Sequence, residues 1–328
     1  MMDLLPEHIT IAVTVFNRRK YLKQAIASAL NQTVPVRVIV VEDCGPDAEL
    51  QHFVESEFGG RIEYFRNPCR RGLFDNWNAC LEYCRTPWLS ILHDDDYLGS
   101  RFVEAVLALN REAPDCGLYF GQTQMVDEAS QPISAGMRVP MKTPWRRVGL
   151  IDSIDNTPFP YAGQLFRVDY GRAVGGFRAT SQFAGDWEMW CRLMGRYGAA
   201  QTSVTVAFCR THGGLERGTS KITLNGRLRP LVFIQQKRVL HQIRQSGAEA
   251  RFDRSTFLQK APMSASYLVR QGAGLTPRML RYNVGLLLRS KPPSWGYGLF
   301  QFAARLSGIG FVRLASRLYR ALSKDAGL

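Results

Sequence analysis

The chain has 328 residues, of which 45% are hydrophobic and 21% are charged, a composition ordinary for a globular protein with an ample core. Nowhere do 18 uncharged apolar residues follow one another, and the N-terminus lacks a basic region followed by an apolar one. We therefore expect neither a membrane-spanning helix nor a signal peptide. The seven cysteines are odd in number and show no paired CxxC spacing, which indicates free thiols and a cytoplasmic, reducing compartment.

The formal charge of +14 is distributed unevenly along the chain. Residues 1–220 carry 23 Lys and Arg against 25 Asp and Glu, whereas residues 221–328 carry 19 against 3. This asymmetry predicts a domain over 1–220 and a basic C-terminal region over 221–328. The excess of positive charge favours an anionic partner for the second region, either nucleic acid or the anionic inner face of a membrane.

Strands and helices alternate over the first 92 residues. Apolar, β-branched runs predict strands, and apolar positions at helical spacing predict amphipathic helices between them. The strands are expected over 9–15, 36–41, 61–65 and 88–92, and the helices over 18–31, 47–58 and 73–83. This alternation is typical of an α/β fold whose mostly parallel sheet is flanked by helices on both faces.

A polar loop follows each of these four strands. The carboxyl ends of parallel strands lie at the same edge of a sheet, and ligands of open α/β sheets bind at that edge. We therefore expect the four loops to form one binding site. They are Phe16-Asn17, Glu42-Asp43, Asn67 to Arg71, and Asp94 to Asp96.

Three consecutive carboxylates, Asp94 to Asp96, follow the apolar run that ends at Leu92. Carboxylates this close raise one another's pKa unless a cation compensates their charge. Their oxygen atoms suit Mg²⁺ or Mn²⁺, which would in turn bind a diphosphate. The alternative is a solvated acidic turn that caps the helix beginning near Ser100.

The pattern is less regular after residue 100. We expect a helix over 101–112, strands over 116–126 and 131–139, a mobile loop over 140–160, a helix over 183–198, a strand over 201–208 and a Gly-rich turn over 209–214. Basic helical stretches are expected over 227–245, 256–271, 276–289 and 295–323. The last of them predicts either an interfacial membrane helix or a helix packed on the main domain.

The order of these motifs resembles the family 2 glycosyltransferases, which have the GT-A fold, a Rossmann-like sheet flanked by helices. The resemblance covers about residues 8–215. It rests on Val15-Phe16-Asn17-Arg18 with Tyr21-Leu22 and Asn31-Gln32-Thr33, on Val41-Glu42-Asp43, on Asn67 with Gly72 and Asn78, on the Asp-rich loop, and on Gly185-Asp186-Trp187-Glu188-Met189-Trp190.

The resemblance implies a set of residues that bind the donor, a nucleoside-diphosphate-sugar. Phe16 and Asn17 would line the pocket for the nucleotide base, and Asp43 would accept a hydrogen bond from that base. Asn78 would belong to the same donor site. Arg71 would contact the diphosphate, with a solvated loop residue as the alternative.

The resemblance also implies a metal ligand and a general base. Asp95 would face the donor ribose or sugar, Asp96 would coordinate Mn²⁺ or Mg²⁺, and Asp94 would share either task. His212 would touch the metal or the diphosphate, with an ordinary turn histidine as the alternative. Asp186 would deprotonate the acceptor hydroxyl, with a plain helix N-cap as the alternative.

Elementary chemistry requires the same groups. Cleavage of a sugar–diphosphate bond requires charge compensation on the leaving group, which a divalent ion and nearby Arg or His can provide. Direct displacement at the anomeric carbon requires one carboxylate on the opposite face to take the acceptor proton. A single base without a covalent partner implies inversion of configuration.

Three positions depart from the family pattern. Thr14 stands where relatives often have Pro, and His93 replaces an acid common at the start of the Asp-rich loop. Gly185 replaces the acid that usually precedes the base, so Glu188 is an alternative to Asp186.

We therefore expect an inverting, metal-dependent glycosyltransferase of cell-surface polysaccharide synthesis, with a glycan or lipid-linked acceptor. It would be cytoplasmic and peripheral at the inner face of the plasma membrane. A nucleic-acid-binding protein is the first alternative, although the basic region contains no recognisable nucleic-acid module and we expect no nucleic-acid partner. A nucleotidyltransferase is the second, although residues 16–20 lack the glycines of a phosphate loop.

Overall fold

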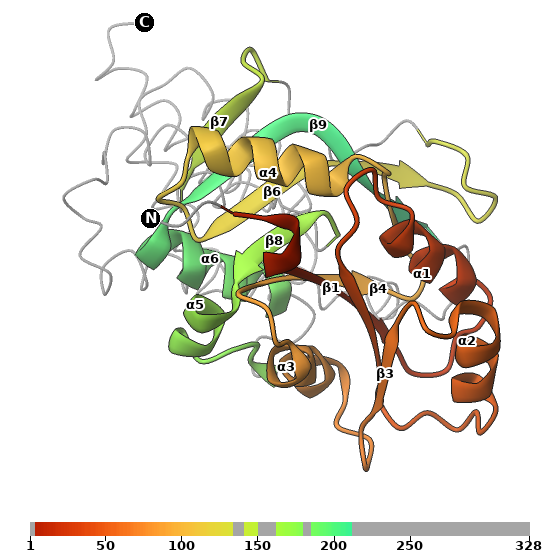
Figure 1. Ribbon diagram of the computed structural model, residues 1–328. Coiled ribbons are helices and arrows are strands. Elements are labelled where there is room, and N and C mark those ends of the chain that lie inside the picture. Colours follow the sequence, from red (N-terminus) through yellow and green to blue (C-terminus); the bar gives the residue numbers. More distant parts are fainter. Residues whose placement is uncertain (1–3, 134–140, 150–161, 180–184, 212–328) are drawn as a thin grey trace, which may run out of the picture. The chain divides into compact units, whose positions relative to one another are not determined.

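The computed structural model describes residues 4–133, 141–149, 162–179 and 185–211 (Figure 1). Within these residues the strands form one mixed sheet in the order β3-β2-β1-β4-β8-β6-β9-β5, and β7 pairs with β9 outside this path. The first described element is a short 3₁₀ helix, η1 (Pro6–His8).

The first half of the sheet is parallel. It contains β1 (Ile9–Val15), β2 (Arg37–Glu42), β3 (Glu63–Arg66) and β4 (Trp88–His93). All seven residues of β1 are buried, as expected for a central parallel strand with helices on both faces. The predicted α/β fold is thereby confirmed.

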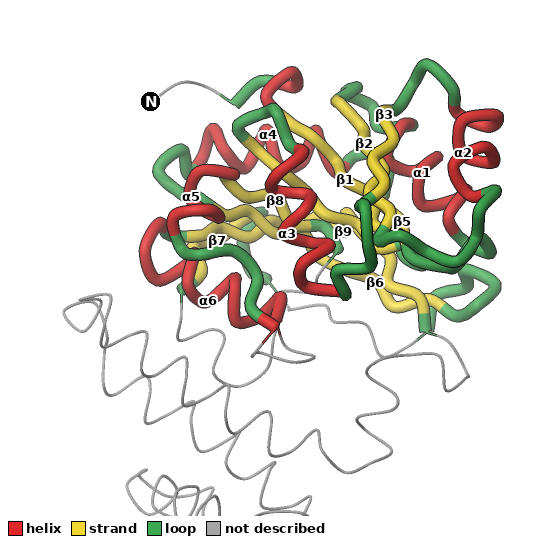
Figure 2. The backbone as a smooth tube through the Cα atoms, turned by 90° about the horizontal axis from the view of Figure 1, so that it is seen from below, coloured by secondary structure: helices red, strands yellow, loops and turns green. Residues whose placement is uncertain are grey.

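In the described part of the chain, six α-helices flank the sheet in two layers. Figure 2 looks onto the layer that contains α3 (Leu73–Tyr83), α5 (Val168–Ala173) and α6 (Gly185–Tyr197). The other layer contains α1 (Leu22–Leu30), α2 (Leu50–Phe58) and α4 (Phe102–Glu112). The main apolar core lies between this layer and the sheet. It contains alternate residues of β1 and the buried faces of these three helices, for example Ile11, Ile26, Val54 and Phe102.

The second half of the sheet is mixed. Its strands are β5 (Tyr97–Leu98), β6 (Leu118–Val126), β7 (Trp145–Val148), β8 (Gln164–Arg167) and β9 (Ala199–Arg210). β8 runs antiparallel to both β4 and β6, while β6 and β9 are parallel. β9 is long enough to pair with β6, β7 and β5. It therefore extends from β7 to β5, next to the loop after β4.

Most of the elements predicted in the described residues are present within a few residues of their expected ends. The expected mobile loop over 140–160 contains β7, and residues 150–161 lie outside the described part, as does most of the strand expected over 131–139. The predicted boundary near 220, the basic region, its interfacial helix and His212 also lie outside it. All seven cysteines are free, as predicted. Among the described helices, none has the length and apolar character to cross a membrane.

Candidate functional site

Three of the four predicted loops leave the sheet side by side because of the strand register. β1 lies between β2 and β4, with Val15 opposite Glu42 and Thr14 opposite His93. The residues that follow these strands therefore emerge at the same carboxyl edge. The loop after β3 joins them through hydrogen bonds to Asp43.

The Asp43 carboxylate is buried and holds this loop in place. Its oxygens accept hydrogen bonds from the backbone N–H groups of Arg71 (2.7 Å) and Gly72 (2.8 Å) and from Asn67 Nδ2 (3.3 Å). Its own N–H donates to the Val15 carbonyl at 2.9 Å. Each carboxylate oxygen has two lone pairs, so Asp43 keeps acceptor capacity for a ligand.

The neighbouring turn is held equally firmly. Glu42 is fully buried and accepts hydrogen bonds from Gly45 N (2.8 Å), Tyr64 Oη (2.6 Å) and Arg66 Nη1 (2.5 Å). Burial and the Glu42 carboxylate both raise the pKa of Tyr64. A Cβ on Gly45 would lie 1.7 Å from the carbonyl oxygen of Phe16, so this position accommodates only glycine.

Phe16 is half-buried at this edge, and the Arg70 guanidinium lies 4.4 Å from its ring centroid. A cation over an aromatic face is an attractive arrangement. Phe16 and Asp43, predicted to bind the nucleotide base, therefore occupy adjoining turns. Asn17 follows Phe16 and is exposed.

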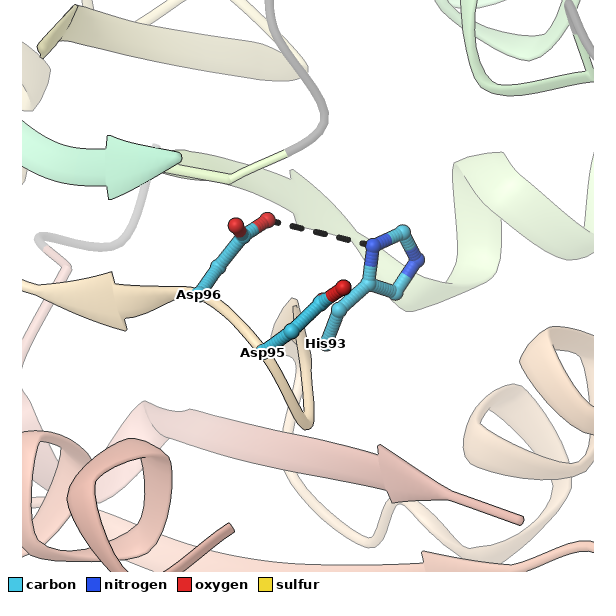
Figure 3. Close-up of side chains that lie close together, drawn as sticks. All are labelled: His93, Asp95 and Asp96. Atoms are coloured by element: carbon cyan, nitrogen blue, oxygen red, sulfur yellow. Dashed lines mark ion pairs between the residues drawn. The ribbon is translucent and has the colours of Figure 1, made fainter. Parts of the chain in front are cut away.

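His93, the last residue of β4, forms a compact cluster with Asp95 and Asp96 of the loop that follows (Figure 3). One potential ligand atom of each residue lies within 4.8 Å of the others, and His93 Nδ1 is 3.9 Å from an Asp96 oxygen. Burial lowers the pKa of His93 to about 4, so the ring is neutral at pH 7 and able to donate a nitrogen lone pair. Two carboxylates and a neutral imidazole at this spacing fit a divalent ion.

Asp96 is oriented from the end of β9. One of its oxygens accepts the backbone N–H of Arg210 at 2.9 Å, and the other lies 3.6 Å from the Cys209 Sγ donor. Such outer contacts fix the direction in which a ligand oxygen points.

Arg18 supplies positive charge to the same loop. Its guanidinium is hydrogen-bonded to Asp95 and lies 3.4 Å from an Asp94 oxygen. Burial raises the pKa of Asp94 to about 7, an effect that Arg18 opposes and the Asp95 charge increases. Arg18 belongs to the motif Val15-Phe16-Asn17-Arg18, but the motif alone assigned no role to the arginine. Its position directly after Asn17 was the available signal.

Arg210 is the second residue that sequence analysis missed. Its guanidinium donates to the Asp95 carbonyl (3.0 Å) and to Gln24 Oε1 (2.6 Å), and it lies 4.1 Å from the Tyr21 ring centroid. It also donates to the carbonyls of Asp127 and Glu128 and to Ser130 Oγ. Arg210 thereby joins α1, the loop after β4 and the loop after β6.

Asp186 lies in the first turn of α6. Burial raises its pKa to about 6, while hydrogen bonds from the backbone N–H groups of Asp186 and Trp187 oppose the shift. The start of α6 packs against α3, since a Cβ on Gly185 would lie 1.9 Å from the Phe74 ring. Phe74 contacts Trp77 edge to face at 5.1 Å, and Trp77 stacks on His93 at 5.4 Å. Asp186 and the acidic loop are thus joined by a short series of packed rings.

Glu188, the alternative base, has a structural role. It is buried, and its two oxygens accept hydrogen bonds from Arg192 Nε (2.9 Å) and Nη2 (2.7 Å). Arg192 also donates to the Gly176 carbonyl at 2.6 Å. Both Glu188 oxygens thus take part in a buried ion pair that fixes the segment before α6.

Two predicted donor-binding residues have other partners in this structure. The Arg71 guanidinium pairs with Glu82 at 2.8 Å, so only its backbone contacts the Asp43 carboxylate. The Asn78 amide is hydrogen-bonded to the backbone of Phe177 in both directions, at 2.9 and 2.8 Å. His212 lies outside the described residues.

Part of the chain is similar in sequence to glycosyltransferases. Residues 10–160 match the family model for glycosyl transferase family 2. Uncharacterized glycosyltransferases of Rickettsia conorii and Rickettsia felis are 32% and 30% identical over 125 residues, which is 37% of this chain and 20% of each relative. Chondroitin synthase of Escherichia coli is 23% identical over 186 residues, 56% of this chain and 26% of that protein. The chain thus spans about a fifth to a quarter of these relatives' length.

Solved structures of S. aureus TarS, residues 1–349, share the fold. The complex with UDP-GlcNAc has a TM-score of 0.55 at 14% identity, covering 95% of this chain and 91% of that one. The complex with UDP has a TM-score of 0.53 at 18% identity, covering 91% and 81%. The predicted GT-A fold is confirmed.

Proposed function

We propose that this chain is a family 2 glycosyltransferase, an inverting, metal-dependent enzyme that moves a sugar from a nucleoside-diphosphate-sugar to an acceptor hydroxyl. One observation carries this proposal. The strand register and the loop contacts place the Asp43 turn and the His93–Asp95–Asp96 cluster at the same edge of the sheet. A base-binding turn beside a divalent-ion site is the arrangement that a nucleotide-sugar requires.

The donor would lie across this edge. The ring of Phe16 offers a stacking face for the base, and Asp43 offers an acceptor for a base N–H. The complexes of TarS with UDP and with UDP-GlcNAc support a nucleotide-sugar donor for this chain. Asn17, Arg71 and Asn78 remain proposed donor contacts. Arg71 would have to leave Glu82 to reach a diphosphate.

The acidic loop would hold Mn²⁺ or Mg²⁺. Asp96 would be a ligand, Asp94 and Asp95 would face the donor and the ion, and His212 would approach from the segment after β9. When bound, the ion would compensate the negative charge that develops on the departing diphosphate. Asp96 is held ready for this role by the backbone N–H of Arg210.

Asp186 would accept the proton of the acceptor hydroxyl. A pKa of about 6 keeps the carboxylate ionised at pH 7 and makes it more basic than an exposed aspartate. With this base and no covalent partner, displacement would invert the anomeric centre.

The acceptor is proposed to be a glycan or a lipid-linked glycan in cell-surface polysaccharide synthesis at the cytoplasmic face of the membrane. Residues 221–328 contain 19 Lys and Arg against 3 Asp and Glu, and this excess of positive charge supports binding to a negatively charged membrane surface.

A donor screen tests the proposal. Purified protein with Mn²⁺ or Mg²⁺ would be offered UDP-, GDP-, dTDP- and CDP-sugars, and slow donor hydrolysis would be recorded. We expect hydrolysis of one donor, lost on removal of the metal and in both Asp96→Ala and Asp186→Ala. Asp115→Ala is the matched control, because Asp115 is an exposed carboxylate paired with Arg147 on the surface. Failure to bind or hydrolyse any donor with metal present would rule the proposal out.

A further inference from the structure

We propose that His93 is itself a metal ligand and that its nitrogen makes the site select Mn²⁺ over Mg²⁺. This inference rests on the proposed function, because it concerns the ion at the same loop. It goes further by assigning a nitrogen ligand at a position where the resemblance predicts an acid.

The distances in the cluster support a shared ion. Two ligand atoms that each lie about 2.1 Å from one ion can be at most about 4.2 Å apart. His93 Nδ1 and its nearer Asp96 oxygen are 3.9 Å apart, within this limit. With Asp95 included, one potential ligand atom of each of the three residues lies within 4.8 Å of the others, so the three side chains are close enough to approach one ion (Figure 3).

The His93 ring is held in place for this task. Its backbone belongs to β4 and pairs with Thr14 of β1. Trp77 stacks on the ring with centroids 5.4 Å apart and planes inclined by 22°. A side chain fixed both by its strand and by a stacked neighbour loses little further freedom when it binds an ion.

The choice of ion follows from the chemistry of the ligands. Mg²⁺ demands oxygen ligands and near-ideal octahedral geometry, so a nitrogen in the first coordination sphere weakens its binding. Affinity for nitrogen-containing sites rises along the transition-metal series, which begins with Mn²⁺. An acid at position 93 would offer a third carboxylate and would suit Mg²⁺ better. Replacement by histidine therefore shifts the preference toward Mn²⁺.

Pulsed electron paramagnetic resonance of Mn²⁺ bound to the donor-free protein tests the ligand directly. We expect a nitrogen coupling that changes when the five histidines carry ¹⁵N. The contribution of one nitrogen should be lost in His93→Gln and retained in His212→Gln and in the control His52→Gln, an exposed position on α2. All histidine coupling should disappear in the double variant His93→Gln/His212→Gln, which removes both histidines placed near the ion. Absence of histidine coupling in the wild-type protein would overturn the inference, whether or not the His93 variant folds. Loss of the nitrogen coupling in His212→Gln, together with its full retention in His93→Gln, would also overturn the inference.

Competition between the two ions tests the selectivity. Mg²⁺ would be titrated against bound Mn²⁺ in the wild-type protein and in His93→Asp. We expect the preference for Mn²⁺ to fall by roughly tenfold in the variant, the size of effect typical of altered metal surroundings. An unchanged ratio in a folded His93→Asp protein would contradict the inference.

The two proposals fail in different ways. If the wild-type protein binds no Mn²⁺ and hydrolyses no donor, the metal-dependent function falls and this inference falls with it. If Mn²⁺ binds and supports hydrolysis without a histidine nitrogen in its coordination sphere, only the role of His93 is wrong.

Discussion

Asp186 and Glu188 are two acids in the first turn of α6 with opposite surroundings. Asp186 is a carboxylate whose charged form is disfavoured by burial, whereas Glu188 is paired with Arg192. These surroundings predict effects of opposite sign on stability when each acid is replaced by its amide.

Asp186→Asn should abolish sugar transfer and make the protein more stable. The folded-state pKa of about 6 exceeds the ordinary value of 3.8. The ionised carboxylate therefore lowers the free energy of unfolding above pH 6, and this loss of stability disappears as the pH falls toward 3.8. Removal of the charge should raise the free energy of unfolding at pH 7 by on the order of 2 kcal/mol. Denaturant titration of both proteins measures the change.

Glu188→Gln is the matched comparison in the same experiment. It leaves the Arg192 charge buried without its full partner, and breaking such a pair costs about 3–5 kcal/mol. A destabilised Asp186→Asn protein, or a stable Glu188→Gln protein, would contradict this account of α6.

The pH dependence of transfer should follow the ionisation of Asp186. A base must be deprotonated, so kcat/KM should fall on the acid side with a midpoint near pH 6 and not near 4. Rates between pH 5 and 8 would be measured together with donor affinity over the same range. A midpoint that appears equally in donor affinity would assign the titration to the donor site, where burial raises the pKa of Asp94 to about 7.

At the scale of single residues, the sequence locates Asp43, Asp95 and Asp96 because each lies within four residues of the end of a predicted strand. It does not reveal the role of Arg18 or Arg210, whose partners lie far away along the chain. Arg18 contacts Asp95 across 77 positions, and Arg210 contacts Asp96 across 114. The partner of Asn78 was missed for the same reason, because no local pattern connects Asn78 with Phe177, 99 positions away.

At the scale of elements, periodicity is informative where an element is long enough to show its apolar pattern. The helix expected over 73–83 has these ends in the structure, and β4 extends the predicted strand by one residue. β5, β7 and β8 have two to four residues and were not predicted. Their antiparallel pairing with distant strands comes from the tertiary fold, which short apolar runs do not specify.

The turn after β2 gives a prediction at this scale. Gly45→Ala forces a methyl group against the Phe16 carbonyl, 1.7 Å away, and so separates the turns after β1 and β2. We expect a loss of about 1–3 kcal/mol in the free energy of unfolding, typical of overpacking, and at least tenfold weaker nucleotide binding. Denaturant titration and calorimetry with UDP, the nucleotide in the TarS complex, measure both.

Gly149→Ala is the control for this substitution. A Cβ there would meet no atom of the described residues within 4 Å, so stability and nucleotide binding should be unchanged. Equal behaviour of the two alanine variants would show that the close approach of the two turns does not shape the donor site.

At the scale of the whole molecule, charge separates a nearly neutral part from a strongly basic one. If residues 221–328 meet a membrane, the full chain should sediment with vesicles containing anionic lipid at low ionic strength. Added salt should release it because exposed charges are screened. Neutral vesicles are the control, and failure to sediment with anionic vesicles at low salt would remove the membrane from the proposal.

The contacts of Arg210 also bear on the order of events during synthesis and folding. Its guanidinium reaches Gln24 across 186 positions, and its backbone orients Asp96. Contacts so distant in sequence close large loops, and such contacts tend to form late. Residues 10–160, which match the family model, contain Gln24 and Asp96 but not Arg210. A nascent chain would therefore carry the whole recognisable motif for some time before the atoms that orient its carboxylates leave the ribosome.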